Sequence, residues 1–563
     1  MNSTGQGGRE GQEPANRPLL SLPPIRPLYE LILAALAALA LAVVMTYPLV
    51  LRIGNSGRVD NGDGQLSIWN VAWVARTLIV DPVHLFDANI FYPHRGTLAY
   101  SENNIGAGIL AIPAYWATRN PYVAHNIVVL LAFTLCALGM YYLVRYLTGD
   151  RRGAAVAAIC FAFCPYVFAR TAHIQLMMTA GLPFSMLALH RLADRPTAGR
   201  GATLGLAMAA QAISCGYYGI FVLLMVGFGI LVIAGTRGLW ASASYWKAIG
   251  VGAVVALLIV TPLFLPYLML QRVTGFARSI DDAKPYSADW RAYFASSAHA
   301  HVWMLYYLGH WNEVLFPGFV ATALGTSGAW IAARSRRREL AILYGGLGVL
   351  ACWVSFGPSA GLYTVLYRTM PVFVWLRAPA RFGLIVAFSL SVLAGVAVAA
   401  ILSRVKRAAL AAAMLSLAAV AGLAVTFPLV DAPPPLPVYR TLATLTRAPV
   451  IEMPFYYPAV GLSQHTKYML ASTSHWMPLV NGYSDYIPPA FYTHVLTLAG
   501  FPSRDAFKIL EPDRVRYAVF HMYGYDTKNR NDVLARLKEF DAYLRPLFMD
   551  DQTRLYEIVG FPR

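Results

Sequence analysis

Eleven long apolar segments constrain the fold of this chain more than any other feature of its sequence. They lie at residues 28–51, 122–146, 153–170, 175–192, 201–214, 217–235, 247–270, 314–333, 340–357, 380–402 and 408–428. A helix needs about 20 apolar residues to cross a hydrocarbon core, and most of these segments approach or exceed that length. Only 13% of the 563 residues are charged, which is about half the share in a soluble protein. The sequence therefore predicts an all-α polytopic membrane protein with about eleven transmembrane helices.

The basic residues predict how these helices are oriented. The chain has 45 Lys and Arg against 28 Asp and Glu, and they do not gather on one soluble face, which argues against nucleic-acid binding. Five alternate loops carry Arg145, Arg151 and Arg152; Arg191, Arg195 and Arg200; Arg237 and Lys247; Arg334 and Arg336–Arg338; and Arg404, Lys406 and Arg407. Because short basic loops stay in the cytoplasm, we expect a cytoplasmic N-terminus and, after an odd number of spans, an extracytoplasmic C-terminus.

The remaining segments divide the chain into three parts. Residues 1–28 are predicted to form a disordered cytoplasmic tail, 29–429 a membrane domain, and 430–563 a small extracytoplasmic α/β domain. In that domain we expect strands at 450–454, 515–520 and 555–559 and a helix at 531–544. The domain contains the polar stretch 481–486, and we expect it to bind an acceptor glycan or shield the site, in a docking or lid role.

The first extracytoplasmic loop, 52–121, is unusually long and contains two apolar stretches. Residues 65–80 carry Trp69 and Trp73 four positions apart, which predicts an amphipathic helix at the membrane interface. Residues 105–117 are too short to span and are predicted to be re-entrant or interfacial.

Residues 201–235 have two possible folds: two helices broken at 214–216, or one tilted helix. The basic run at 334–338 favours two helices, because one would reverse the side of every later loop.

The predicted outer loops hold a converging set of polar and ionisable residues. These are Asp60, Asp63, Glu102, His173, Gln175, Arg377 and Arg381. Ionisable groups at membrane depth are costly, so such a set is a functional hypothesis. Each also has a structural interpretation. The two aspartates flank glycines as turn residues do, Glu102 is placed to cap the following helix, His173 suits an interface, and the arginines suit snorkelling to lipid headgroups.

These residue types suit group transfer from a lipid phosphate. An acid of the first loop would act as general base on an acceptor hydroxyl. Arg377 and Arg381 would bind phosphate, which guanidinium matches bidentately, and apolar grooves between helices would hold a lipid tail. Asp60, Asp63 and Glu102 have the hard oxygen ligands that Mg²⁺ or Mn²⁺ prefers, although nothing in their spacing demands a metal.

The sequence resembles the GT-C class of membrane glycosyltransferases over roughly residues 28–430. The resemblance to uncharacterised bacterial members rests on the acidic first loop and on the stretches 86–94, which contains Asn89, 99–102, which contains Tyr100, 173–176 and 376–382. It implies an inverting transfer from a polyprenyl-phosphate sugar in the bacterial inner (plasma) membrane. Asp63 is the first candidate for the base and Asp60 the second. Asn89 and Tyr100 join His173, Gln175, Arg377 and Arg381 as substrate-binding candidates.

Several alternatives remain open at the level of sequence. The chain could be a lipid-linked sugar flippase or transporter, a polymerase or ligase of lipid-linked glycans, or a non-catalytic scaffold. The acids lie in a loop instead of mid-helix, and the two halves of the chain show no symmetry, which disfavours a transporter. The expected partners are the bilayer, a polyprenyl-phosphate sugar and a glycan, lipid or protein acceptor.

Overall fold

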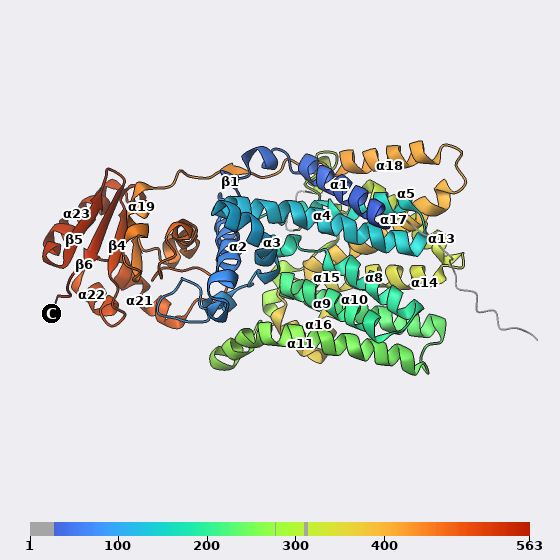
Figure 1. Cartoon of the computed structure of the whole chain (residues 1–563), viewed down its shortest axis with the longest axis horizontal. Helices are drawn as coiled ribbons and strands as arrows, with labels where there is room; N and C mark the ends of the chain where they lie inside the picture. Colours follow the sequence, from blue (N-terminus) through green and yellow to red (C-terminus); the bar gives the residue numbers. More distant parts are fainter. Residues whose placement is uncertain (1–26, 276, 309–312, 563) are drawn as a thin grey trace, which may run out of the picture.

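The computed structural model describes residues 27–562, apart from 276 and 309–312. Figure 1 shows a bundle of long helices with a mixed domain of strands and short helices at one end. All but the last two residues of the predicted cytoplasmic tail lie outside the described residues.

The apolar segments fold as helices, as predicted. Eight helical stretches in the described part are long and apolar enough to cross a membrane. They comprise α1 (Pro27–Met45), α4 (Pro121–Thr148), α5 and α6 (Arg151–Ala162, Pro165–Phe168), α7 and α8 (Ile174–Met177, Gly181–Asp194), α10 (Gly216–Arg237), α11 (Ala243–Thr274), α14 and α15 (Arg338–Leu340, Gly346–Ser355) and α17 (Gly383–Leu402, entered through Pro379–Phe382). The other three predicted spans are shorter helices: α9 (Ala198–Ser214), α13 (Phe319–Ala333) and α18 (Ala408–Leu423). The residues 201–235 therefore form two helices, which meet at Cys215.

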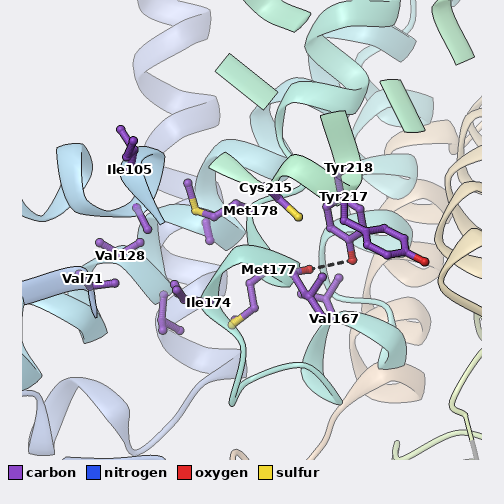
Figure 2. Packing of buried hydrophobic residues seen from close by; sticks show 14 of the residues in the cluster. Val71, Ile105, Val128, Val167, Ile174, Met177, Met178, Cys215, Tyr217 and Tyr218 are labelled. Atoms are coloured by element: carbon purple, nitrogen blue, oxygen red, sulfur yellow. Dashed lines mark hydrogen bonds between the residues drawn. The ribbon is translucent and has the colours of Figure 1, made fainter. Parts of the chain in front are cut away.

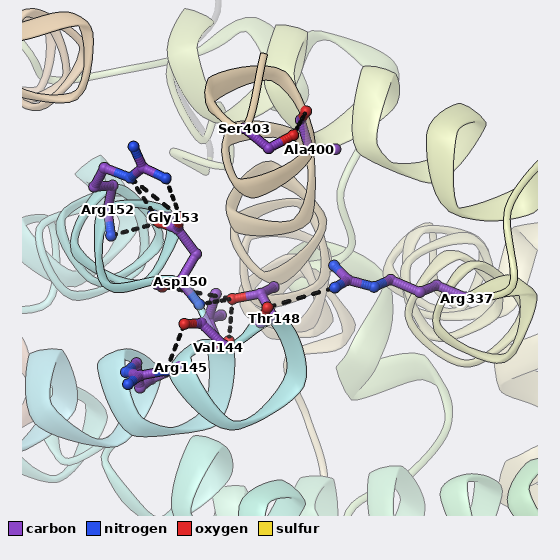
Figure 3. A network of polar contacts seen from close by, with 10 residues as sticks. Val144, Arg145, Thr148, Asp150, Arg152, Gly153, Arg337, Ala400 and Ser403 are labelled. Carbon is purple, nitrogen blue, oxygen red and sulfur yellow. Dashed lines mark hydrogen bonds and ion pairs between the residues drawn. The ribbon is translucent and has the colours of Figure 1, made fainter. Parts of the chain in front are cut away.

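The basic loops meet at one end of the bundle. Figure 3 shows the ends of α4, α5 and α17 together with Arg337, whose guanidinium donates to the Thr148 carbonyl at 3.4 Å. Arg237 pairs with Asp194 and Glu339, both at 2.7 Å, and so joins α10 to α8 and α14. The C-terminal domain lies at the opposite end. The basic end and the end that carries this domain are thus separated by the length of the helices.

The first loop forms two helices, α2 (Gly62–Val80) and α3 (Ile105–Thr118). The position of α2 differs from the predicted one at the membrane interface, because its Trp69 and Trp73 side chains are only 1% and 4% exposed. The C-terminal domain covers this face through α20 (Thr466–Ala471) and Trp476, whose ring centroid lies 5.6 Å from that of Trp73. The aromatic pair that suggested a membrane surface is instead part of an internal junction.

The C-terminal domain is built on a four-stranded sheet in the order β3-β4-β6-β5. β3 (Val450–Met453), β4 (Tyr517–His521) and β6 (Thr553–Ile558) correspond to the predicted strands, and β3 and β4 are parallel. β5 (Leu544–Met549) was not predicted, because the helix expected to reach Leu544 is α23 (Thr527–Glu539) and ends earlier. The helices α19 (Pro437–Thr444), α21 (Pro489–Ala499) and α22 (Arg504–Leu510) complete the domain.

Two kinds of contact join this domain to the membrane helices. β1 (Ser56–Gly57) of the first loop pairs antiparallel with β2 (Val430–Asp431), where the chain leaves α18. One hydrophobic cluster also runs through both parts, and Figure 2 shows its packing among α2, α3, α4, α7 and α10. Tyr217 of this cluster also lines the polar cavity described next.

Candidate active site

A polar cavity of about 370 Å³ lies between the helix bundle and the C-terminal domain. Among the residues that line it are six of the predicted site residues, namely Asp63, Glu102, His173, Gln175, Arg377 and Arg381. They come from the first loop, the α6–α7 turn and the segment before α17, which are far apart in sequence. The structure therefore brings most of the predicted set to one place.

Asp63 and His173 form a pair in this cavity. Asp63 lies in the first turn of α2, behind the N-cap Asn61, and its Oδ2 atom is 3.4 Å from Nε2 of His173. A helix N-terminus favours a negative charge at such a position. Burial lowers the pKa of His173 to about 4, and the nearby arginines act in the same direction, while Asp63 opposes them. Burial thus favours the neutral form of His173, whose Nε2 atom faces the carboxylate of Asp63.

Asp60 is not among the residues that line the cavity. Its carboxylate accepts a hydrogen bond from Nε of Arg58 at 2.9 Å, and Arg58 also donates to Thr171 at 2.8 Å. The Arg58 hydrogen bond lowers the pKa of Asp60. Of the two candidates for the base, only Asp63 has its carboxylate at the cavity.

Glu102 lines the cavity but has a structural task as well. Its carboxylate accepts the backbone N–H groups of Gly216 and Tyr217 at 3.2 and 3.4 Å, and so caps the N-terminus of α10. Burial raises the pKa of Glu102, while these hydrogen bonds oppose that change. The helix that it caps is not the one that follows it in sequence, which was the predicted partner. This contact also fixes the break between α9 and α10.

Three arginines give the cavity its positive charge. Arg278 and Arg377 both pair with Asp485, at 3.0 and 3.2 Å. The Arg381 guanidinium lies over the Tyr217 ring, 4.6 Å from its centroid, and has no hydrogen-bond or ion-pair partner for its side chain in the described part of the chain. A guanidinium that reaches a cavity without an acidic partner is suited to an anion.

Several polar lining residues were not among the predicted site residues, including Arg278, Tyr286, Tyr483 and Asp485. Tyr483 and Asp485 belong to the stretch 481–486 of the C-terminal domain, for which the sequence predicts acceptor binding or a docking or lid role. No local pattern signalled Arg278, whose partner Asp485 is 207 positions away.

Asn89 and Tyr100, predicted to bind substrate, lie outside the cavity lining and hold the first loop to the C-terminal domain. Asn89 is 5% exposed, donates to the Ser472 hydroxyl and the Met477 carbonyl at 3.0 Å each, and accepts from Trp69 at 3.2 Å. The Tyr100 ring packs edge-on against Tyr486. Their polar groups and rings are already engaged within the protein.

The predicted metal ligands do not converge. Asp60 is paired with Arg58, Glu102 caps α10, and Asp63 faces His173. Within residues 27–562, where the structure describes them, no group of three or more His, Cys, Asp or Glu is placed to hold a metal ion. Asp63 and Glu102 nevertheless line the same cavity, and Mg²⁺ often takes only one or two carboxylates together with a substrate phosphate. The Mg²⁺ or Mn²⁺ site therefore stays a prediction.

An apolar groove of about 870 Å³ begins close to the cavity and runs between α3, α4, α8 and α9. Gly106 and Ser214 line one end, two residues from the Gly216 that Glu102 contacts, and Arg191 and Arg200 line the other. From Arg200 to Ser214 the helix rises ~21 Å. The groove therefore follows the helices across most of a hydrocarbon core.

No protein-family model matches the chain, and no curated protein matches it either. Solved structures do. The arabinofuranosyltransferase AftD from mycobacteria aligns over 94% of this chain and 40% of its own, with a TM-score of 0.56 and 16% identity. ArnT from Cupriavidus metallidurans, bound to undecaprenyl phosphate, aligns over 95% and 99% with a TM-score of 0.50 and 13% identity. This chain thus spans less than half the length of the arabinofuranosyltransferase. The chain has the fold of the GT-C membrane glycosyltransferases, as the sequence resemblance predicted.

Proposed function

We propose that this protein is an inverting glycosyltransferase that moves a sugar from a polyprenyl-phosphate donor to an extracytoplasmic acceptor. The observation that carries the proposal is one cavity that combines the Asp63–His173 pair with three arginines and adjoins an apolar groove. The undecaprenyl phosphate bound to the ArnT neighbour supports a lipid phosphate as the donor's carrier.

In the proposed reaction, Asp63 acts as the general base. Its carboxylate takes the proton of the acceptor hydroxyl while the acceptor oxygen attacks the anomeric carbon of the donor. The bond from that carbon to the phosphate oxygen breaks in the same displacement, so the anomeric configuration inverts and no sugar–enzyme bond forms. Neutral His173 holds the carboxylate in place by its Nε2–H and carries no charge that would weaken the base.

The arginines stabilise the leaving group. A sugar phosphodiester carries one negative charge, and the released lipid phosphate carries nearly two. Charge therefore develops on the phosphate during bond breaking, where preorganised cations stabilise the transition state more than the bound donor. Arg381, which has no acidic partner in the described part of the chain, is the first candidate for this contact, with Arg377 beside it in the cavity.

The apolar groove is the proposed site of the polyprenyl tail. Its lining is dominated by Ala, Leu, Ile and Met side chains. A tail placed there keeps its phosphate at the Gly106 end, beside the cavity.

The proposed location is the bacterial inner (plasma) membrane, with the cavity and the C-terminal domain on the extracytoplasmic side. The five basic loops support this orientation by the positive-inside rule, because they lie at the end of the bundle opposite the C-terminal domain. The acceptor is then a glycan, lipid or protein of the cell envelope.

The test is turnover by the purified full chain in detergent. It is incubated with a panel of undecaprenyl-phosphate-linked sugars and a cell-envelope acceptor fraction, and released undecaprenyl phosphate is measured. We expect release with one donor of the panel, and a loss of about 10²-fold or more in Asp63→Asn. Sugar-lipid movement across vesicles that persists in Asp63→Asn, without release of lipid phosphate, would instead identify a flippase.

A further inference from the structure

We infer that Asp485 is an internal competitor for the phosphate-binding arginines, which yields to the lipid phosphate on binding and replaces it on release. This inference rests on the proposed function and adds to it a role for the C-terminal domain. In this inference Asp485, which lies outside the membrane helices, controls how tightly the lipid phosphate is bound.

The geometry of the ion pairs carries the first step. One carboxylate oxygen of Asp485 lies 3.0 Å from Nη2 of Arg278, and the other lies 3.2 Å from Nη1 of Arg377. A phosphate presents a similar pair of oxygens to guanidinium groups. The carboxylate therefore occupies the position at which two arginines would bind a phosphate.

The charges of the cavity carry the second step. Its lining holds three arginines, Arg278, Arg377 and Arg381, and three carboxylates, from Asp63, Glu102 and Asp485. The carboxylate of Asp485 already neutralises part of the charge of Arg278 and Arg377, so an added phosphate competes with it for these guanidinium groups. Like charges brought this close in a partly desolvated site repel each other strongly.

Of the three carboxylates, Asp485 is the one that can withdraw. Asp63 lies in the first turn of α2 and faces His173, and Glu102 is held by the first N–H groups of α10. Asp485 lies in a segment without helix or strand, and its side chain is 42% exposed. Partly exposed ion pairs contribute little free energy each, so they exchange readily for another anion.

The segment that carries Asp485 is short and anchored at both ends. The Asn481 side chain donates to the Glu452 carbonyl at 2.9 Å and accepts from the Glu452 N–H at 2.8 Å. At the other end, the Tyr486 N–H donates to the Tyr100 carbonyl at 2.9 Å. Residues 482–485 thus form a loop between two fixed points, which lets the carboxylate move away and return to the same arginines. The return of Asp485 would speed the release of the lipid phosphate after each transfer.

The experiment compares the binding of undecaprenyl phosphate to purified full-length variants in detergent. Asp485→Asn keeps the size of the side chain but removes the competing charge, so we expect it to bind the lipid roughly three- to tenfold more tightly, the range for loss of two partly exposed ion pairs. Arg377→Gln should bind more weakly. Asp431→Asn is the matched control, because Asp431 also pairs with an arginine, Arg52 at 3.0 Å, away from the cavity.

A second measurement needs no substitution. Undecaprenyl phosphate should increase amide hydrogen exchange of residues 482–485 in the unaltered protein, because the loop loses its ion pairs. If Asp485→Asn binds equally or less tightly while Arg377→Gln is weakened, Asp485 merely positions the arginines and the inference is overturned, although the proposed function stands. If the unaltered protein does not bind the lipid, both fall. Asp485→Ser provides a second variant in case the first does not fold.

Discussion

At the scale of single residues, the offset of three positions from Asp60 to Asp63 decides their chemistry. Asp63 is carried into the cavity by the first turn of α2, whereas Asp60 precedes the helix and is paired with Arg58. A carboxylate whose lone pairs are engaged by a guanidinium has a lowered pKa, as Asp60 does, and is a weak base. Both aspartates look alike in the sequence, and only the start of the helix separates their roles.

We therefore expect Asp60→Asn and Asp63→Asn to differ sharply. Asp60→Asn should keep glycosyl transfer within a few-fold of the unaltered rate, while Asp63→Asn should lose about 10²-fold or more and still bind undecaprenyl phosphate. Initial rates and lipid binding, measured on the same preparations, check this. Equal losses in the two variants would argue against Asp63 as the base.

Residues of the site that local sequence predicts differ from those that depend on contacts between distant segments. Asp63, His173, Gln175, Arg377 and Arg381 could be chosen from sequence, because their stretches lie where the chain meets the predicted outer surface. Arg278 and Asp485 could not, because their pairing depends on how two segments 207 positions apart are packed together. The resemblance of residues 86–94 to the family predicts Asn89 as a ligand, but its amide makes structural hydrogen bonds, and a buried structural amide looks the same in sequence as a binding amide.

At the scale of elements, the sequence predicts where the helices lie along the chain but not whether lipid or protein covers each face. The length of the apolar segments predicts eleven spans, and each of them corresponds to a helix in the structure. The break at Cys215 also agrees with the structure, and Glu102 explains it as the cap of α10. In contrast, the aromatic face of α2 is covered by protein. The sequence does not distinguish this burial from exposure to lipid, because both surroundings select the same apolar side chains.

The groove formed by α3, α4, α8 and α9 leads to a prediction about chain length in the donor. Ala207→Phe places an aromatic ring in the groove lining, so it should raise KM several-fold for a long polyprenyl donor and less for a short one, because only the long tail needs the blocked space. Initial rates against donor concentration measure this. Val254→Phe, on the exposed side of α11, should leave both KM values unchanged; similar shifts in both variants would exclude the groove.

The Asn481 anchor predicts a dependence of stability on pH. His465 accepts a hydrogen bond from the Asn481 amide through Nδ1, at 3.1 Å, and donates Nε2–H to the Tyr456 carbonyl. Burial lowers its pKa from 6.5 to about 4. The unfolded chain therefore takes up the proton first, and stability should fall as the pH drops below 6.5, by up to ~1.4 kcal/mol per pH unit, until about pH 4.

The melting temperature of the purified protein between pH 7 and 5 measures this effect. His465→Gln should melt lower at pH 7, because it fits the two partners less well. Its decrease between pH 7 and 5 should be smaller than that of the unaltered protein, because glutamine does not titrate. An unchanged pH dependence in this variant would show that other groups cause the acid sensitivity.

At the scale of the whole molecule, the cavity exists only because two distant parts of the chain are joined. The first loop supplies Asp63 and Glu102, and the C-terminal domain supplies Tyr483 and Asp485. The sequence predicts the long first loop and the strands of the C-terminal domain, but no pattern in it predicts that the two lie against each other. The hydrogen bonds of Asn89 to residues more than 380 positions away make them one unit.

Asn89→Ala should therefore loosen the C-terminal domain from the helix bundle. It leaves the Trp69 N–H, the Ser472 hydroxyl and the Met477 carbonyl without this partner in a buried place, at a cost of about 2 kcal/mol or more. Limited proteolysis should then cut more quickly between residues 430 and 480, and glycosyl transfer should fall with it. Asn529→Ala, on the exposed face of α23, is the control and should resist proteolysis as the unaltered protein does.

The contact between Trp73 and Trp476 has a practical consequence. Two indole rings with centroids 5.6 Å apart, inclined by 57° and contributed by opposite sides of the junction, are close enough to couple electronically. Their combined near-ultraviolet dichroism would vanish on separation, while the backbone signal of the helices would persist. The near-ultraviolet circular dichroism of the unlabelled protein should therefore report whether the C-terminal domain is docked on the helix bundle.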